Sequence, residues 1–215
     1  MLAVDFGAKS KLNLLLLGAH CDDIEIGCGG TVLRLIADDR IEHIKWIVFA
    51  STEERKTEAI ACAEHFLRNV SSKEIVVLNF RDTVLADNRE EIKKLLGAIK
   101  ISFSPDLIFT HHRNDLHQDH KLLSEVTWNV FRNHLILEYE IPKYDGDLGH
   151  PNFFVTLDKA FVQQKIDALL EFYGSQKEKH WFDEETFLSL LRVRGLEVAS
   201  PTRYAEAFHV KKVSY

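Results

Sequence analysis

The chain has 215 residues, of which 46% are hydrophobic and 28% are charged. This length and composition fit one globular domain with a sizeable core, so we expect residues 1–215 to form a single domain. The formal net charge is −6, and Lys and Arg form no concentrated basic stripe. We therefore expect no nucleic-acid partner, because phosphate neutralisation needs clustered cations.

The apolar run at residues 14–17 is too short to cross a bilayer, and acidic and histidine side chains follow it directly. We expect no transmembrane or targeting segment and a cytoplasmic location. The cysteines Cys21, Cys28 and Cys62 are odd in number and form no Cys-x-x-Cys pair, as expected for reduced thiols inside a cell. The sequence leaves open whether the chain forms a homo-oligomer.

Apolar runs alternate with segments of helical character in the first half of the chain. The expected strands are residues 13–17, 44–49, 75–78 and 107–110; residues 31–37 are expected to form part of a helix, and residues 53–68 and 90–101 are expected to form two more helices. This alternation predicts parallel strands joined by crossover helices, an α/β fold with a mostly parallel sheet. We expect Gly27-Cys28-Gly29-Gly30 to permit a tight turn and a close approach of the following helix to the sheet.

The second half is less regular. Helices are expected at residues 122–131, 159–172 and 184–194, and strands at residues 135–141, 153–157 and 205–210. Residues 142–151 are rich in turn formers and long enough to border a site. We expect substrate specificity to reside in loops such as residues 142–151 and 175–185.

Two short segments rich in His and Asp each follow an apolar run that is typical of a buried strand. They are Gly18-Ala19-His20-Cys21-Asp22-Asp23 and His111-His112-Arg113-Asn114-Asp115-Leu116-His117-Gln118-Asp119-His120. Ligands of open α/β sheets bind beyond the carboxyl ends of the strands, at a point where the strand order reverses. The two segments are therefore expected to share one site.

The residue types in these segments favour a metal centre. A catalytic zinc ion usually has three protein ligands and keeps one position for water, which it acidifies. His20 and Asp23 are three residues apart, so a turn can direct both to one ion, and His120 can complete the set. Asp22 would lie beside the ion as the general base. We expect one Zn²⁺ per chain, with another divalent metal left open.

His117 is the second candidate catalytic group. A carboxylate that hydrogen-bonds an imidazole raises its basicity, so either Asp119 or Asp115 is expected to hold His117 protonated beside a developing oxyanion. Such a donor stabilises a tetrahedral intermediate.

Four further side chains are less clearly assigned. One of His111 and His112 is expected to line the site or to hold the loop by a hydrogen bond. Asp82 follows an apolar strand run, where it would hydrogen-bond hydroxyl groups of a substrate or cap the next segment. From the residues alone, Arg55 fits an ion pair with a nearby glutamate on a helix surface.

The two segments resemble the signatures of a known family. His20-Cys21-Asp22-Asp23 resembles the His-Pro-Asp-Asp motif, and Asp115-Leu116-His117-Gln118-Asp119-His120 resembles the Asp-x-His-x-Asp-His motif, of the LmbE-like or PIG-L zinc-dependent N-acetylglucosamine deacetylases. Weaker matches in the family's order are Arg55-Lys56-Thr57-Glu58, Phe80-Arg81-Asp82, Pro105-Asp106, Tyr173-Gly174-Ser175-Gln176 and Tyr204-Ala205-Glu206-Ala207-Phe208. The resemblance implies a Rossmann-like three-layer αβα sandwich.

The resemblance also implies roles for individual residues. The implied metal ligands are His20, Asp23 and His120, the implied base is Asp22, the implied oxyanion stabiliser is His117, and Arg55 is placed near the substrate. Cys21 stands where the family usually has Pro, which brings a soft ligand atom beside the metal. A small buried side chain is the favoured interpretation of Cys21, because its neighbours already supply three ligands.

These observations predict a zinc-dependent hydrolase that removes the acetyl group from an N-acetylated amino sugar or its conjugate and releases acetate. Two alternatives stay open. A metal-dependent phosphohydrolase would hold a second ion about 3.5–4 Å from the first. A noncatalytic sugar-binding or nucleotide-binding module of the same fold would bind its ligand without turnover.

Overall fold

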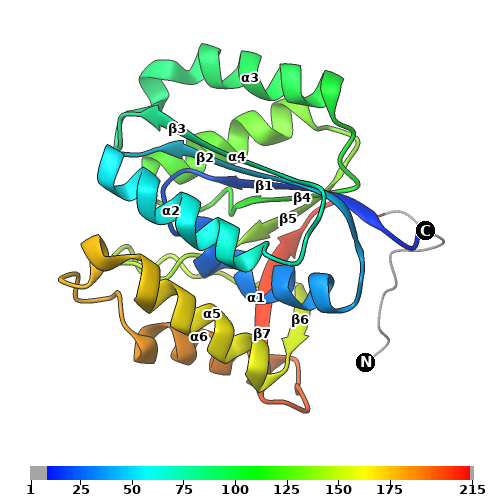
Figure 1. Ribbon diagram of the computed structural model, residues 1–215, viewed down its shortest axis with the longest axis vertical. Coiled ribbons are helices and arrows are strands. Elements are labelled where there is room, and N and C mark those ends of the chain that lie inside the picture. Colours follow the sequence, from blue (N-terminus) through cyan, green and yellow to red (C-terminus); the bar gives the residue numbers. More distant parts are fainter. Residues whose placement is uncertain (1–8, 214–215) are drawn as a thin grey trace.

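A seven-stranded sheet with the strand order β3-β2-β1-β4-β5-β7-β6 forms the centre of the computed structural model, which describes residues 9–213 (Figure 1). The strands are β1 (Leu12–Gly18), β2 (Ile41–Ala50), β3 (Lys73–Phe80), β4 (Leu107–His111), β5 (Leu135–Tyr139), β6 (Phe153–Leu157) and β7 (Tyr204–Val210). Strands β1 to β5 pair in parallel, whereas β7 is antiparallel to β5 and β6. The predicted α/β fold with a mostly parallel sheet is confirmed.

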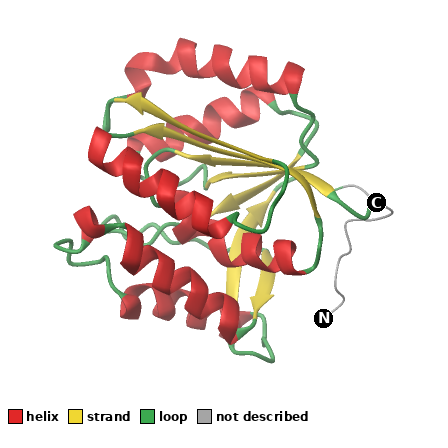
Figure 2. Ribbon diagram, in the orientation of Figure 1, coloured by secondary structure: helices red, strands yellow, loops and turns green. Residues whose placement is uncertain are grey.

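Helices cover both faces of the sheet, which gives the expected three-layer αβα sandwich. They are α1 (Asp23–Ala37), α2 (Glu53–Phe66), α3 (Arg89–Ser102), α4 (Gln118–Val130), α5 (Lys159–Phe172) and α6 (Glu184–Glu197), with the short 3₁₀ turns η1 (Leu85–Asn88) and η2 (Gly174–Gln176). Helices α3 and α4 lie on one side, and the other four lie on the opposite side (Figure 1 and Figure 2). None of the helices within residues 9–213 is long and apolar enough to cross a membrane.

Strand β1 contributes to a hydrophobic core on each face of the sheet. Leu14 and Leu16 belong to the cluster under α1, α2 and α5, whereas Leu15 and Leu17 belong to the cluster under α3 and α4. Successive strand side chains point to opposite faces, and both faces of this strand are covered. That double burial is why residues 14–17 form an unbroken apolar run.

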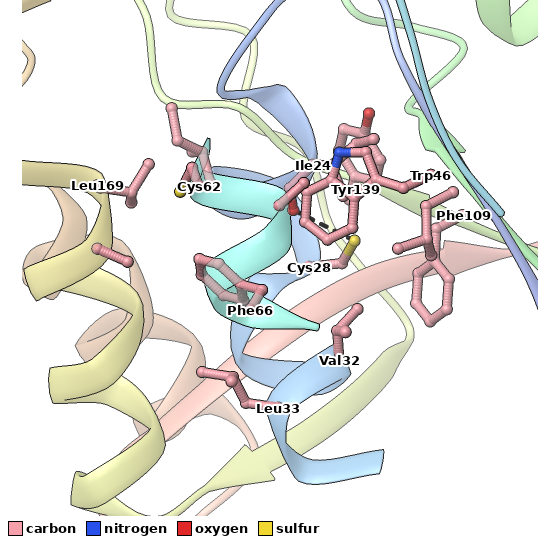
Figure 3. Close-up of a cluster of buried hydrophobic side chains, with 14 of the residues drawn as sticks. Ile24, Cys28, Val32, Leu33, Trp46, Cys62, Phe66, Phe109, Tyr139 and Leu169 are labelled. Atoms are coloured by element: carbon pink, nitrogen blue, oxygen red, sulfur yellow. Dashed lines mark hydrogen bonds between the residues drawn. The ribbon is translucent and has the colours of Figure 1, made fainter. Parts of the chain in front are cut away.

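Helix α1 begins at Asp23 and includes residues 31–37, so Gly27-Cys28-Gly29-Gly30 lie inside the helix and the expected tight turn there was wrong. The expected close approach to the sheet is confirmed. A Cβ atom at Gly27 would lie 2.2 Å from the Tyr139 ring, and Figure 3 shows Tyr139 beside Cys28 in the buried cluster. Packing α1 directly on β5 outweighs the helix cost of a glycine, about 1 kcal/mol each.

The other predicted elements are present with small shifts at their ends. The strand at residues 153–157 and the helix at residues 159–172 have the predicted bounds. Helix α4 starts earlier than predicted, at Gln118, so it begins inside the second His and Asp segment. The chain extends the sheet from β1 to β3 on one side and then returns to place β4 on the other side of β1. The strand order therefore reverses between β1 and β4.

Candidate functional site

Both segments rich in His and Asp lie at the carboxyl ends of β1 and β4, where the strand order reverses. His20 follows β1 directly and Asp23 begins α1, while His120 lies in the first turn of α4. Asp22 occupies the N-cap position of α1 with φ at 120°, and its side chain makes no capping hydrogen bond. A non-glycine residue at such a φ is strained, and strain of this kind is concentrated at functional sites.

His20, Asp23 and His120 converge on one point. Nδ1 of His20 lies 3.1 Å from Nε2 of His120. Oδ2 of Asp23 lies 3.4 Å from Nδ1 of His20, and Oδ1 of Asp23 lies 3.5 Å from Nε2 of His120. Ligand atoms around a tetrahedral zinc ion with bonds of about 2.0 Å are about 3.3 Å apart, so this donor set fits zinc.

The far nitrogen of each imidazole contacts a carboxylate. Nε2 of His20 lies 2.9 Å from Asp82 and 3.2 Å from Asp119, and Nδ1 of His120 lies 2.9 Å from Asp115. A carboxylate partner of this kind orients a metal-binding imidazole and fixes which nitrogen carries its proton. Burial disfavours a charged His20, but its hydrogen bonds to Asp119, Asp23 and Asp82 raise its pKa well above the usual value. The surroundings of His20 therefore stabilise positive charge.

Three sets of side chains in the described part of the chain could each hold a metal ion. Within each set, the potential ligand atoms lie within 4.8 Å of one another. The sets are His20 with His117 and His120, Asp23 with His111 and His120, and His20 with Asp82 and Asp119. His20, Asp23 and His120 each belong to at least one of these sets, but no single set contains all three.

His111 belongs to the site and His112 does not. Nε2 of the fully buried His111 lies 3.1 Å from the Asp23 carboxylate, and its ring stacks on His120 at a centroid distance of 3.8 Å. His112 instead stacks on His209 of β7, at 3.6 Å. Neighbouring side chains along a strand point to opposite faces of the sheet, so only one of these two histidines was expected to line the site. The sequence does not say which face each of them takes.

The buried Asp22 and the half-buried Arg55 form an ion pair at the edge of the site. Their closest atoms are 2.9 Å apart, and the Arg55 side chain also donates to the backbone carbonyl of Cys21. Burial raises the pKa of Asp22 to about 6, although the Arg55 charge opposes the shift. Arg55 therefore does not pair with a glutamate on the helix surface; it contacts the candidate base.

His117 caps helix α4 and faces the two histidine ligands. Its Nδ1 accepts a hydrogen bond from the Asp119 backbone N–H at 3.3 Å, and its ring lies 4.8 Å from that of His20 and 4.5 Å from that of His120. The Asp119 and Asp115 carboxylates are directed to His20 and His120 instead. Burial, and then the neighbouring histidines, lower the pKa of His117. This arrangement differs from the expected pairing with a carboxylate, and it leaves Nε2 of His117 to carry the proton.

Cys21 occupies a packed position away from the ligand atoms. Its side chain is buried, and the thiol donates to the Ala50 carbonyl at 3.6 Å. Burial raises the pKa of the thiol to about 12. A protonated thiol that is directed at β2 supports the interpretation as a small buried side chain. Asp82, by contrast, is the more exposed member of the site, with 63% of its side chain accessible.

The comparison with known proteins agrees with the motifs. The family profile described as PIG-L, GlcNAc-PI de-N-acetylase, matches residues 15–131. The chain belongs to the PIG-L family of deacetylases. "Uncharacterized deacetylase YaiS" of Escherichia coli (strain K12) is 32% identical over an alignment of 172 residues that covers 75% of this chain and 91% of that protein.

Solved structures share the fold of this PIG-L family member. The conserved protein TT1542 from Thermus thermophilus has a TM-score of 0.74 at 24% identity, over 95% of this chain and 97% of that chain. N,N'-diacetylchitobiose deacetylase from Pyrococcus horikoshii has a TM-score of 0.72 at 21% identity, over 96% of this chain and 87% of that chain. At these identities the likeness supports the fold alone.

Proposed function

We propose that the chain is a zinc-dependent hydrolase that removes the acetyl group from an N-acetylated amino sugar or a conjugate of one, and releases acetate. The observation that carries the proposal is the placement of Nδ1 of His20 3.1 Å from Nε2 of His120, with Oδ2 of Asp23 3.4 Å from the first nitrogen and Oδ1 of Asp23 3.5 Å from the second. The family description and the diacetylchitobiose deacetylase among the structural neighbours support an N-acetylated sugar as the substrate class.

His20, Asp23 and His120 would hold the ion. A bound zinc ion supplies Lewis acidity, which polarises the amide carbonyl and acidifies water. Asp115 and the pair Asp82 and Asp119 would keep the two imidazoles in their metal-binding tautomers.

The remaining side chains would move the protons and stabilise the developing charge. Asp22 would accept a proton from the attacking water and pass it to the departing amine nitrogen as the amide C–N bond breaks. His117 would donate its Nε2–H to the oxygen that was the amide carbonyl. Arg55 would hold the Asp22 carboxylate in place, since the two side chains form an ion pair. Asp82 would contact the substrate from its exposed side.

We further propose that specificity resides in the loops beside α6. A groove of about 780 Å³ lies between these loops and α6; Pro142, Leu148 and His150 border it from one loop and His180 and Asp183 from the other, and none of the proposed metal ligands lines it. Its size suits a small-molecule ligand. A cytoplasmic location and a single domain stay predictions from the sequence, which leaves open whether the chain forms a homo-oligomer.

The test is acetate release from a panel of N-acetylglucosamine conjugates, with the bound metal quantified on the same sample. Acetate release with about one zinc ion per chain would support the proposal. Two ions per chain with turnover of phosphate esters would favour the phosphohydrolase alternative, and sugar binding without turnover would favour a noncatalytic module. His120→Ala is the matched variant, and it should lose both the metal and the acetate release.

A further inference from the structure

The loop at residues 142–151 is closed on itself by a buried ion pair. Nζ of Lys143 lies 2.6 Å from both carboxylate oxygens of Asp147, and the two side chains are only 10% and 6% exposed. Gly146 lies between them with φ at 61°, a left-handed conformation that glycine adopts readily. A lysine that is buried to this extent needs compensating negative charge.

The same lysine also reaches the metal motif. Nζ of Lys143 lies 3.1 Å from Oδ2 of Asp115, the atom that lies 2.9 Å from Nδ1 of His120. Asp147 adds a second link, because its carboxylate accepts the Leu116 backbone N–H at 2.6 Å. The loop thus contacts the carboxylate that orients His120.

The far end of the loop is anchored to helix α6. Arg194 donates to both carboxylate oxygens of Glu140, at 2.9 and 2.8 Å, and to the Gly149 carbonyl at 3.1 Å. Glu140 in turn accepts the Gly149 backbone N–H at 3.1 Å. The loop is therefore attached to the metal motif near Lys143 and to helix α6 near Gly149. These two attachments fix the position of Lys143.

We propose that Lys143 is a positioning residue for the metal ligand His120 and acts through Asp115. The inference rests on the proposed metal role of His120. Oδ1 of Asp115 accepts the His117 backbone N–H at 2.8 Å, while Oδ2 is shared by His120 and Lys143. Without Lys143 the carboxylate keeps its backbone contact but loses the charged partner that holds Oδ2 toward the imidazole. The ligand nitrogen of His120 is then less well directed at the ion.

The sign of the effect on zinc affinity separates positioning from simple electrostatics. Lys143→Met removes a positive charge near a cation site, so Coulomb repulsion alone predicts tighter zinc binding. Positioning predicts weaker binding, by about 10-fold, the low end of the range for residues that orient a metal ligand. The measurement is the zinc dissociation constant, obtained by competition with a chromogenic chelator on the full chain.

Lys121→Met is the matched control, because Lys121 is exposed on α4 beside His120 and the substitution removes the same charge. It should leave zinc affinity unchanged or slightly tighter. Lys143→Arg retains a charged donor and should restore most of the affinity. Unchanged or tighter zinc binding in a folded Lys143→Met protein would overturn the inference.

If Lys143→Met does not fold, Lys143→Gln decides the question. It removes the same positive charge but keeps a polar side chain beside Asp147 and Asp115, so positioning again predicts weaker zinc binding, and unchanged or tighter binding refutes the inference. The wild-type protein and His120→Ala test the underlying site separately. If the wild type binds no zinc, or His120→Ala binds as tightly as the wild type, the proposed metal site itself is wrong; if only the Lys143 result differs from expectation, the metal site stands.

Discussion

His20 and His120 face each other with Nδ1 of the first only 3.1 Å from Nε2 of the second, although they lie 100 positions apart in the chain. The other nitrogen of each ring contacts a carboxylate, which is where its proton belongs. The two nitrogens that face each other are then both lone-pair acceptors. Two acceptors at this distance repel unless a cation or an additional proton lies between them. The pair therefore presents a site for a cation that the Asp23 carboxylate completes.

The first prediction concerns these ligands. His20→Ala, Asp23→Ala and His120→Ala should each lower zinc occupancy, because three protein ligands are the minimum expected for a catalytic zinc ion. The fold should survive, since the three residues follow the ends of β1 and β4. Metal analysis measures the zinc content of each variant, and far-ultraviolet circular dichroism checks that the fold is retained. If all three variants retain full zinc, the ligand assignment is wrong.

The second prediction separates chemistry from metal binding at Asp22. Asp22→Asn nearly preserves the shape of the side chain but cannot accept a proton, so it should retain zinc and lose turnover by about 10²–10⁴-fold. Acetate release is measured on protein with verified zinc content. Wild-type turnover in the metal-loaded variant would remove Asp22 from the role of base.

The sequence predicted those residues of the site whose relative positions depend only on their spacing along the chain. His20 and Asp23 share one turn, and His117 and His120 share another, so two apolar strands followed by these segments were enough to bring them together. Which carboxylate contacts which imidazole was not predictable. Asp119 contacts His20 of the other segment, and that contact depends on how β1 and β4 pair in the folded sheet.

Two other features depend on packing that no short segment encodes. Helix α1 starts at Asp23 although it contains three glycines, because its contact with Tyr139 of β5 is a property of the whole sheet. Lys143 contacts the metal motif from a loop in which turn formers are the main sequence signal. By contrast, the hydrophobic alternation that defines the sheet is local, so the order of strands and helices was predictable.

The third prediction tests the close packing of α1. Gly27→Ala would place a Cβ atom 2.2 Å from the ring of Tyr139, which is fully buried and donates to the Leu17 carbonyl at 2.7 Å. The variant should unfold at lower denaturant, with a loss of about 1–3 kcal/mol for overpacking. Gly97→Ala on α3 is the control, because no atom lies within 4 Å of its new Cβ. That substitution should stabilise the protein by about 0.5–1 kcal/mol. Equal effects at the two glycines would contradict the packing argument.

The last prediction concerns the pH dependence of stability and the buried residue Glu25. Its carboxylate has no exposed surface, one oxygen accepts the Tyr173 hydroxyl, and the other has no hydrogen-bond partner among the described residues. Burial raises the pKa of Glu25 from 4.5 to about 7, because the charged form is poorly solvated. A raised pKa in the folded state means that the folded protein holds this proton more tightly than the unfolded chain does.

The stability that this proton contributes is fully present below the unfolded pKa of 4.5 and is lost as the pH rises through about 7. This pKa shift corresponds to a decrease of about 3 kcal/mol in the free energy of unfolding from low pH to high pH. Glu25→Gln carries no titrating group at this position, so its free energy of unfolding should fall less than that of the wild type between pH 5 and pH 9. Urea unfolding of chelator-treated protein at several pH values measures the difference. Glu91→Gln, at an exposed position on α3, should retain the wild-type dependence. If the curves for the wild type and Glu25→Gln run parallel across this range, Glu25 does not change its charge there.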